Sequence, residues 1–222
     1  MAVVGLKLVI TAQEVLRKAG IPSAVTGDVG LSYHGVDIVT HDIELCISAC
    51  QRKSSLEALH TRPDLYEALP DLLAPSFYHP YKFGAARFKV LNVDEPFELH
   101  LIEDSMLGLR LTPTLLEQGL CFANMHPQLQ DLCEDIDDDA ELAAITWPSL
   151  AGFLCGWLRL AETNKLSETS MIYLMQAERL IDANDEIDED WLERNVKEPA
   201  CCEQAKKLLK GKTGRIMQST WD

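Results

Sequence analysis

The first half of the chain mixes two spacings of hydrophobic residues. Apolar residues recur at helical spacing through residues 6–19, and Gly20 and Pro22 end this predicted helix. A short strand is predicted at 23–26, where Gly27-Asp28-Val29-Gly30 breaks it before a short helix at 31–34. Apolar and polar residues then alternate from Ile43 to Ile47, which predicts a second strand. This order of elements indicates a sheet with flanking helices.

A hairpin is the strongest pattern in the next segment. Residues 53–60 and 64–73 are predicted helices, and a loop rich in aromatic residues and Pro spans 75–84. Strands at 85–91 and 97–102 then flank the turn residues 92–95. A four-residue turn pairs Lys89 with Glu98 and Arg87 with His100. A five-residue turn would pair Lys89 with Leu99 and bury two charges, so burial cost favours the shorter turn.

The second half of the chain has a different pattern of apolar and polar residues. No convincing strand pattern follows residue 104, and helices are predicted at 147–161, 168–182, 189–196 and 200–210. We therefore expect an α+β fold, with a mixed sheet and flanking helices at 1–106 and a helical domain at 107–222. An acidic linker is expected at 134–141.

Composition and charge limit the cellular locations and the binding partners that can be expected. Of 222 residues, 47% are hydrophobic and 25% charged, which is ordinary for a globular protein. Because there is no long apolar run and no charged leader, we expect a cytoplasmic protein that neither enters a membrane nor is secreted. Seven cysteines without a C-x-x-C pair fit reduced thiols. The net charge of −15 repels phosphate backbones, so a small molecule is a better candidate substrate than nucleic acid.

Paired carboxylates carry the candidate chemistry. Strand alternation places Asp42 and Glu44 on one face, about 6–7 Å apart. Two such charges repel each other unless a cation lies between them or a proton bridges them. Oxygen ligands with room for water suit Mg²⁺, so a magnesium site is predicted; the alternative is a pair partly satisfied by Arg87, Lys89 or backbone donors. Glu98 also lies with His100 on the polar face of its strand.

The spacing of these residues resembles a known superfamily. An apolar strand, a Gly turn, a spacer and Asp-x-[Asp/Glu] are similar to the nucleotidyltransferases of polymerase β type. Within it, the likeness is greatest to small lincosamide and aminoglycoside nucleotidyltransferases and to fungal nucleotidyltransferase-like proteins. The fungal likeness rests on Gly27-Asp28-Val29-Gly30-Leu31 and on His41-Asp42-Ile43-Glu44. It covers residues 6–104.

This resemblance implies a reaction and a role for each site residue. A hydroxyl of a small molecule would attack the α-phosphorus of a nucleoside triphosphate (NTP) and release pyrophosphate, with up to two Mg²⁺ ions bound. Backbone N–H groups at Gly27 and Asp28 would hold phosphates. The remaining roles are metal binding by Asp42, Glu44 and Glu98, catalysis by these three with His100, and neutralisation of phosphate charge by Lys82, Arg87 and Lys89.

Three departures from the family pattern keep an alternative open. Asp28 stands where Gly or Ser is usual, Glu occupies two carboxylate positions, and His41 replaces a basic residue. A fold relative that has lost nucleotide transfer, and that serves as a binding protein or does other small-molecule chemistry, would show such changes. An Asp28 side chain that points into the cleft favours this alternative, whereas one that caps the following helix favours transfer. An antitoxin-like or other interaction partner is a third possibility.

Overall fold

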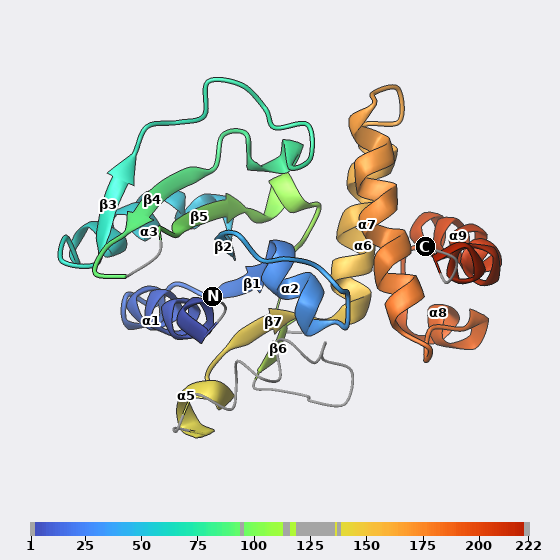
Figure 1. The fold of residues 1–222 in the computed structure, drawn as a ribbon, viewed down its shortest axis with the longest axis horizontal. Coiled ribbons are helices and arrows are strands. Elements are labelled where there is room, and N and C mark those ends of the chain that lie inside the picture. The colour runs from blue at the N-terminus through green and yellow to red at the C-terminus, as the bar shows by residue number, and fades with distance from the viewer. Residues whose placement is uncertain (1–2, 94–95, 113–115, 119–135, 137–138, 220–222) are drawn as a thin grey trace.

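A five-stranded mixed sheet is the centre of the computed structural model, which describes residues 3–93, 96–112, 116–118, 136 and 139–219. The spatial order is β1-β2-β5-β4-β3, in which β2 and β5 are parallel and the other neighbours antiparallel (Figure 1). The strands are β1 (Ser23–Thr26), β2 (Ile43–Ile47), β3 (Tyr66–Leu69), β4 (Ala86–Val90) and β5 (Glu98–Glu103). The prediction of an α+β fold with a mixed sheet is confirmed.

The register of the β4–β5 hairpin follows the burial argument. Arg87 pairs with His100 and Lys89 with Glu98, as the shorter turn predicts. On the other face of this hairpin, Phe88 lies opposite Leu99 in the core. Charge burial thus sets the register, and with it the positions of Arg87 and Glu98.

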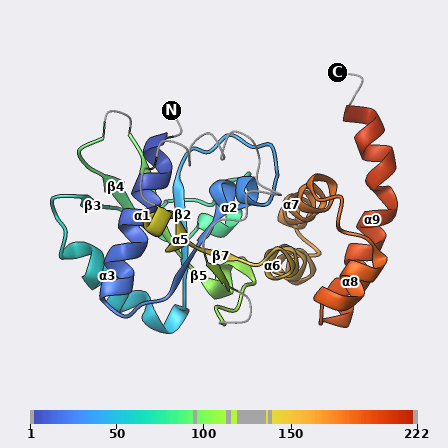
Figure 2. The same ribbon diagram turned by 90° about the horizontal axis from the view of Figure 1, so that it is seen from below.

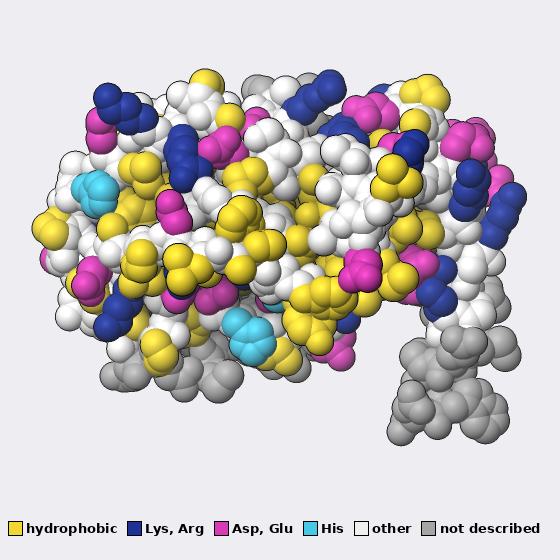
Figure 3. Space-filling view, turned by 90° about the horizontal axis from the view of Figure 1, so that it is seen from above, with side chains coloured by type: hydrophobic (Ala, Val, Ile, Leu, Met, Phe, Trp, Pro, Cys, Tyr) yellow, Lys and Arg dark blue, Asp and Glu magenta, His cyan; other side chains and the backbone are white. Residues whose placement is uncertain are grey.

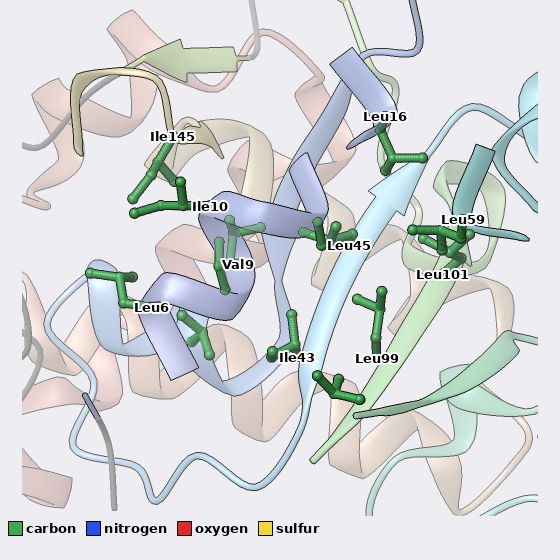
Figure 4. Close-up of a cluster of buried hydrophobic side chains, with 14 of the residues drawn as sticks. Leu6, Val9, Ile10, Leu16, Ile43, Leu45, Leu59, Leu99, Leu101 and Ile145 are labelled. Atoms are coloured by element: carbon green, nitrogen blue, oxygen red, sulfur yellow. The ribbon is translucent and has the colours of Figure 1, made fainter. Parts of the chain in front are cut away.

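One face of the sheet packs on the N-terminal helix. The helices of this half are α1 (Val3–Lys18), α2 (Gly27–Tyr33) and α3 (Arg52–His60), with single 3₁₀ turns at Ala49–Gln51, Pro80–Lys82 and Asp104–Leu107. Figure 4 shows Leu6 and Val9 of α1 beside Ile43 and Leu45 of β2, all buried. Burying each such side chain stabilises the fold by roughly 1.5–3 kcal/mol. The apolar positions of the strand therefore face α1, and its polar positions face the other way.

The other face of the sheet packs on the C-terminal half. Cys46 of β2 and Ile102 of β5 lie in a second buried cluster with Phe153 and Trp157. The helices of this half are α5 (Asp139–Ala143), α6 (Leu150–Thr163), α7 (Thr169–Ala183), α8 (Glu189–Asn195) and α9 (Pro199–Ser219). Figure 2 shows α6 and α7 between the sheet and the pair α8 and α9. Among the described residues, no helix has the length and apolar character needed to cross a membrane.

Two elements differ from the sequence prediction. The helix predicted at 64–73 is wrong: β3 forms there and pairs with β4, with Tyr66 buried against Phe88. Strands also occur after residue 104, because β6 (Leu116–Gln118) pairs with β7 (Thr146–Pro148). Trp147 of β7 is fully buried and stacks on Tyr33 at 4.1 Å between ring centroids. Distant partners fix both elements, and local spacing does not reveal such partners.

The predicted division of the chain is untested by these features. All five strands of the main sheet end by Glu103, and the long helices α6 and α7 begin after Ser149. Most of the acidic linker predicted at 134–141 lies outside the described residues, and α5 begins within its last part. The boundary at residue 106 therefore stays a prediction.

His34 joins the two halves at the end of α2. Its Nε2 donates to the carbonyl oxygen of Pro148 at 2.9 Å, and its own carbonyl accepts from Asn184 Nδ2 at 2.8 Å. Burial lowers the pKa of His34 to about 4, although the Pro148 hydrogen bond opposes the shift. The ring is therefore neutral in the folded chain at neutral pH.

We expect this buried imidazole to make folding sensitive to mild acid. An unfolded chain takes up the proton near pH 6.5, but folded His34 takes it up only at about 4, so stability is full above 6.5 and falls as the pH drops to 4. Urea denaturation across this range should give a shallower loss for His34→Gln, by up to about 3 kcal/mol. The matched control is His60→Gln, because His60 is exposed. Parallel curves for His34→Gln and the unmodified protein would contradict the assignment.

Candidate functional site

The candidate site lies where β2 and β5 run side by side. Glu44 of β2 is in register with His100 of β5, and Asp42 directly precedes β2. His100 Nε2 lies 3.7 Å from Asp42 Oδ2 and 3.3 Å from Glu98 Oε2. The two strands thus bring Asp42, Glu98 and His100 together on the polar face of the sheet.

An ammonium group lies between the carboxylates of Asp42 and Glu44. Lys82 Nζ lies 2.8 Å from Glu44 Oε1 and 3.1 Å from Asp42 Oδ2. Tyr81 donates its hydroxyl to the same Glu44 oxygen at 3.3 Å. Both residues come from the 3₁₀ turn Pro80–Lys82, at the end of the aromatic loop. The cation that the two carboxylates require is therefore supplied by the chain itself.

The charges of Glu44 and Lys82 depend on each other because both side chains are buried. Glu44 is 1% exposed and Lys82 6%. Burial raises the pKa of Glu44, and the attraction of Lys82 opposes that rise. For Lys82, burial lowers the pKa, but attraction by Glu44 and Asp42 outweighs it and the net shift is upward. Removal of either charge would leave the other buried without compensation.

Gly27 begins α2 directly against the Glu44 carboxylate. Its φ is +61°, a conformation that favours glycine, and a Cβ at this position would lie 2.1 Å from Glu44 Cδ. The hydroxyl of Thr26 also donates to the Glu44 backbone oxygen at 3.4 Å. The Gly turn and the carboxylate are therefore in direct contact.

Asp28 points into the site. It is 3% exposed, its Oδ1 has no hydrogen-bond partner in the described part of the chain, and His79 Nε2 lies 3.8 Å from that oxygen. Burial is the main cause of the raised pKa of Glu44, and the negative charge of Asp28 adds to it. This orientation is the one that favours the alternative to nucleotide transfer.

Glu98 and His100 form the outer part of the network. The Arg87 guanidinium grips Glu98 with contacts of 2.8–3.0 Å. Burial is the main cause that lowers the pKa of His100 to about 4, and the positive charge of Lys82 adds to this effect. The negative charges of Asp42 and Glu98 oppose the shift. His100 is therefore a neutral imidazole at pH 7.

The structure brings most of the predicted site residues together. Two of the predicted phosphate-binding cations, however, contact carboxylates of the chain. Lys82 and Arg87, predicted to neutralise phosphates, bind carboxylates, while Lys89 is exposed opposite Glu98. His79 and Tyr81 were missed by sequence reasoning; their only signal is their place in the loop rich in aromatic residues and Pro. No group of three or more His, Cys, Asp or Glu side chains in the described segments is placed to hold a metal ion.

Comparison with known proteins relates this arrangement to solved structures. No protein-family model matches the chain, and no curated protein matches it in sequence. An antigenic nucleotidyltransferase-like protein from Paracoccidioides brasiliensis is similar in structure, with a TM-score of 0.53 and 12% identity over 96% of this chain and 90% of that one. The chain has a nucleotidyltransferase-like fold.

Weaker similarities involve the antibiotic-resistance factor ANT(2″)-Ia. Its solution structure gives a TM-score of 0.44 and 9% identity, over 99% of this chain and 98% of that one. Its complex with adenylyl-2″-tobramycin gives 0.43 and 9%, over 95% and 98%. Both TM-scores are below 0.5, so neither similarity supports a statement about this chain, and function must be derived from the site.

Within this nucleotidyltransferase-like fold the described site has an excess of negative charge. The four carboxylates are those of Asp28, Asp42, Glu44 and Glu98; the permanent cations paired with them are Lys82 and Arg87, and Lys89 is exposed opposite Glu98. Asp42 and Glu98 are also the carboxylates that reach solvent, with side chains 27% and 35% exposed. The accessible edge of the site therefore carries two carboxylates, each paired with a cation of the chain.

We expect Lys82→Met to destabilise the fold by about 3–5 kcal/mol at pH 7, because Glu44 is left as an uncompensated buried charge. The loss should shrink as the pH falls, since protonation of Glu44 removes that charge. Adding Glu44→Gln to Lys82→Met should recover much of the loss at pH 7. Urea denaturation of the single and double variants measures each value.

The matched control for Lys82 is Lys53→Met. Lys53 and Glu57 form an exposed pair at 3.9 Å, with side chains 91% and 67% exposed. Such a pair contributes about 0–1 kcal/mol at most. Equal losses for the two lysine variants would contradict a buried ionic unit.

Gly27→Ala should destabilise the fold by about 2–4 kcal/mol, because the methyl group meets Glu44 and φ is positive. Gly20→Ala provides the comparison: its φ is +73° but the added Cβ has open space. Strain alone should cost about 1–2 kcal/mol there. Thermal or urea unfolding should separate the two variants, and identical losses would mean that the Glu44 contact is unimportant.

Proposed function

We propose that this protein uses its nucleotidyltransferase-like fold to bind a small molecule that carries an amino group, and that it does not transfer nucleotides. The observation that carries the proposal is the Lys82 ammonium, 2.8 Å and 3.1 Å from the carboxylates of Glu44 and Asp42. The site thus has its own internal cation.

A lysine cannot replace the magnesium ions that the resemblance implies. Nucleotidyl transfer requires charge stabilisation at both the attacking and the leaving oxygen, which two divalent ions supply. The Lys82 ammonium carries one charge and three N–H donors, of which two are directed to Asp42 and Glu44. Asp28 adds a negative charge beside the Gly turn, where the triphosphate would have to approach. Both features disfavour a triphosphate ligand.

The same charges favour an amine. The partly exposed carboxylates of Asp42 and Glu98 can accept hydrogen bonds from an ammonium group. The loop that delivers Lys82 also exposes Phe77, Tyr78 and Phe83, at 57%, 68% and 48%. Figure 3 views this side, where hydrophobic side chains gather over the middle of the face. Exposed aromatic rings on the loop that carries Lys82 suit a cationic ligand with an apolar body.

Nucleotide transfer is the second candidate, and one observation favours it. Glu44 Oε2 has no hydrogen-bond partner among the described residues, and Asp42, Glu44 and Glu98 lie on one face of neighbouring strands. If Lys82 turned away, these three carboxylates would hold Mg²⁺, which would supply charge to neutralise phosphates. His100, in register with Glu44 on the neighbouring strand, is the further side chain that the resemblance implicates in catalysis.

Thermal unfolding with defined probes separates the two candidates. Spermidine serves as the amine probe, and Mg²⁺ with each nucleoside triphosphate serves as the transfer probe. We expect saturating spermidine to raise the midpoint by about 5–10 °C, from roughly 2.7 kcal/mol at 100 times its dissociation constant. Mg²⁺ with nucleotides should produce no rise.

Matched charge variants test whether the amine binds at this site. Asp42→Asn with Glu98→Gln should abolish the spermidine shift, whereas Glu189→Gln with Asp190→Asn on α8 removes two exposed acids elsewhere and should preserve it. Equal shifts in the two double variants would refute an amine site. A magnesium-dependent rise with a nucleotide, lost in Asp42→Asn with Glu44→Gln, would establish the second candidate instead.

A further inference from the structure

Two cysteines meet between α6 and α9, on the opposite side of α6 from Trp157. Cys155 and Cys201 are 6% and 5% exposed. Cys201 Sγ lies 4.0 Å from the Cys155 carbonyl oxygen and 3.6 Å from Glu198 Oε2. Their thiols also form a hydrogen bond. Sequence reasoning gave this pair no role, because the two residues are 46 positions apart.

The two thiols are electronically unequal. The hydrogen bond with Cys201 is the main cause that lowers the pKa of Cys155; burial opposes it, and the charge of Arg159 adds to it. The same hydrogen bond, with burial, raises the pKa of Cys201. The Glu198 carboxylate, 3.6 Å from Cys201 Sγ, disfavours a thiolate at Cys201. Cys155 is therefore the candidate nucleophile, because thiolates are the nucleophilic form of cysteine.

A positively charged cavity gives access to Cys155. The cavity has a volume of about 250 Å³, and its lining includes Cys155 with the cationic side chains of Arg110, Arg159 and Lys197. Glu198 is the acidic side chain of the lining, and it is paired with Arg159. The remaining two cations lie on exposed residues. The side chains that line the cavity thus carry a net positive charge, opposite in sign to the net charge of the whole chain, which is −15.

Cys201 lies in the wall of a neighbouring cavity. It lines a second cavity, of about 690 Å³, and Arg159 and Glu198 contribute to the lining of both cavities. The Arg159–Glu198 pair thus separates two solvent-accessible pockets, each with one thiol of the pair in its wall. A small reagent can approach Cys155 from the first pocket, while a leaving group has space to depart.

We propose that Cys155 is a reactive thiol for small anionic disulfides and that Cys201 resolves the mixed disulfide. The Cys155 thiolate attacks one sulfur of the reagent, forms a mixed disulfide and releases one thiolate. Cys201 then loses its proton to solvent and attacks the Cys155 sulfur, which forms the Cys155–Cys201 disulfide and releases the second thiolate. Two protein thiols are oxidised, and the reagent is reduced to two thiols.

This inference is independent of the proposed function. It rests on the thiol pair and its cavity, and the amine site lies on the sheet side of α6. Oxidation would join α6 to the first turn of α9 by a covalent bond.

Three disulfides of similar size but different charge test the cavity. Dithiodipropionate is anionic, hydroxyethyl disulfide is neutral and cystamine is cationic. Peptide mass spectrometry of the full chain should show Cys155 reacting fastest with the anionic reagent, about tenfold faster than with cystamine. The product should contain the Cys155–Cys201 linkage. Similar rates for all three reagents, or a linkage of Cys155 to Cys202, would overturn the proposal.

Variants separate the charge of the cavity from its thiols. Arg110→Gln and Lys197→Gln should each reduce the anionic preference by about threefold, whereas Lys210→Gln, an exposed charge change on α9, should not. Cys201→Ser should stop the reaction at the mixed disulfide on Cys155. If Cys201→Ser fails to fold, the charge variants still decide the question, because an unchanged preference in Arg110→Gln and Lys197→Gln would overturn it.

Discussion

The buried carboxylate of Glu44 is the constraint on which the arrangement of the site depends. It lies in β2, an interior strand of the mixed sheet, is 1% exposed, and has core on both faces of that sheet. A charge in that position must be compensated inside the protein. The Lys82 ammonium and the Tyr81 hydroxyl supply this compensation, and Gly27 leaves the space in which the carboxylate lies.

This requirement connects the two halves of the chain. Tyr81 and Lys82 reach Glu44 from a 3₁₀ turn, and the Tyr81 ring packs edge-on against Trp157 of α6 at 5.3 Å between centroids. Helix α6 therefore supports the turn that carries the cation. Because Cys155 lies only two residues from Trp157, a covalent link at Cys155 acts on the helix that supports this turn.

Local patterns predicted those features that local physics determines. The alternation around Ile43 placed β2, and the cost of burying Lys89 placed the hairpin register. The strand β3 was missed because its partner β4 supplies its stability from a distance. Paired carboxylates on β2 called for a cation, yet residue spacing cannot distinguish a lysine 40 positions away from a metal ion. Nor does spacing bring Cys155 to Cys201.

The identity of the cation decides what a nucleotidyltransferase-like fold can do here. Lys82 is tethered to the same chain, so it competes for Asp42 and Glu44 at an effective concentration of about millimolar or higher. A divalent ion must displace it, and the displaced ammonium must then find solvent or a phosphate. Magnesium affinity and the position of Lys82 are consequently linked: whatever favours the lysine between the carboxylates weakens the metal by the same free energy. Asp28 adds to this bias, since its negative charge beside Glu44 favours a retained internal cation over an incoming triphosphate.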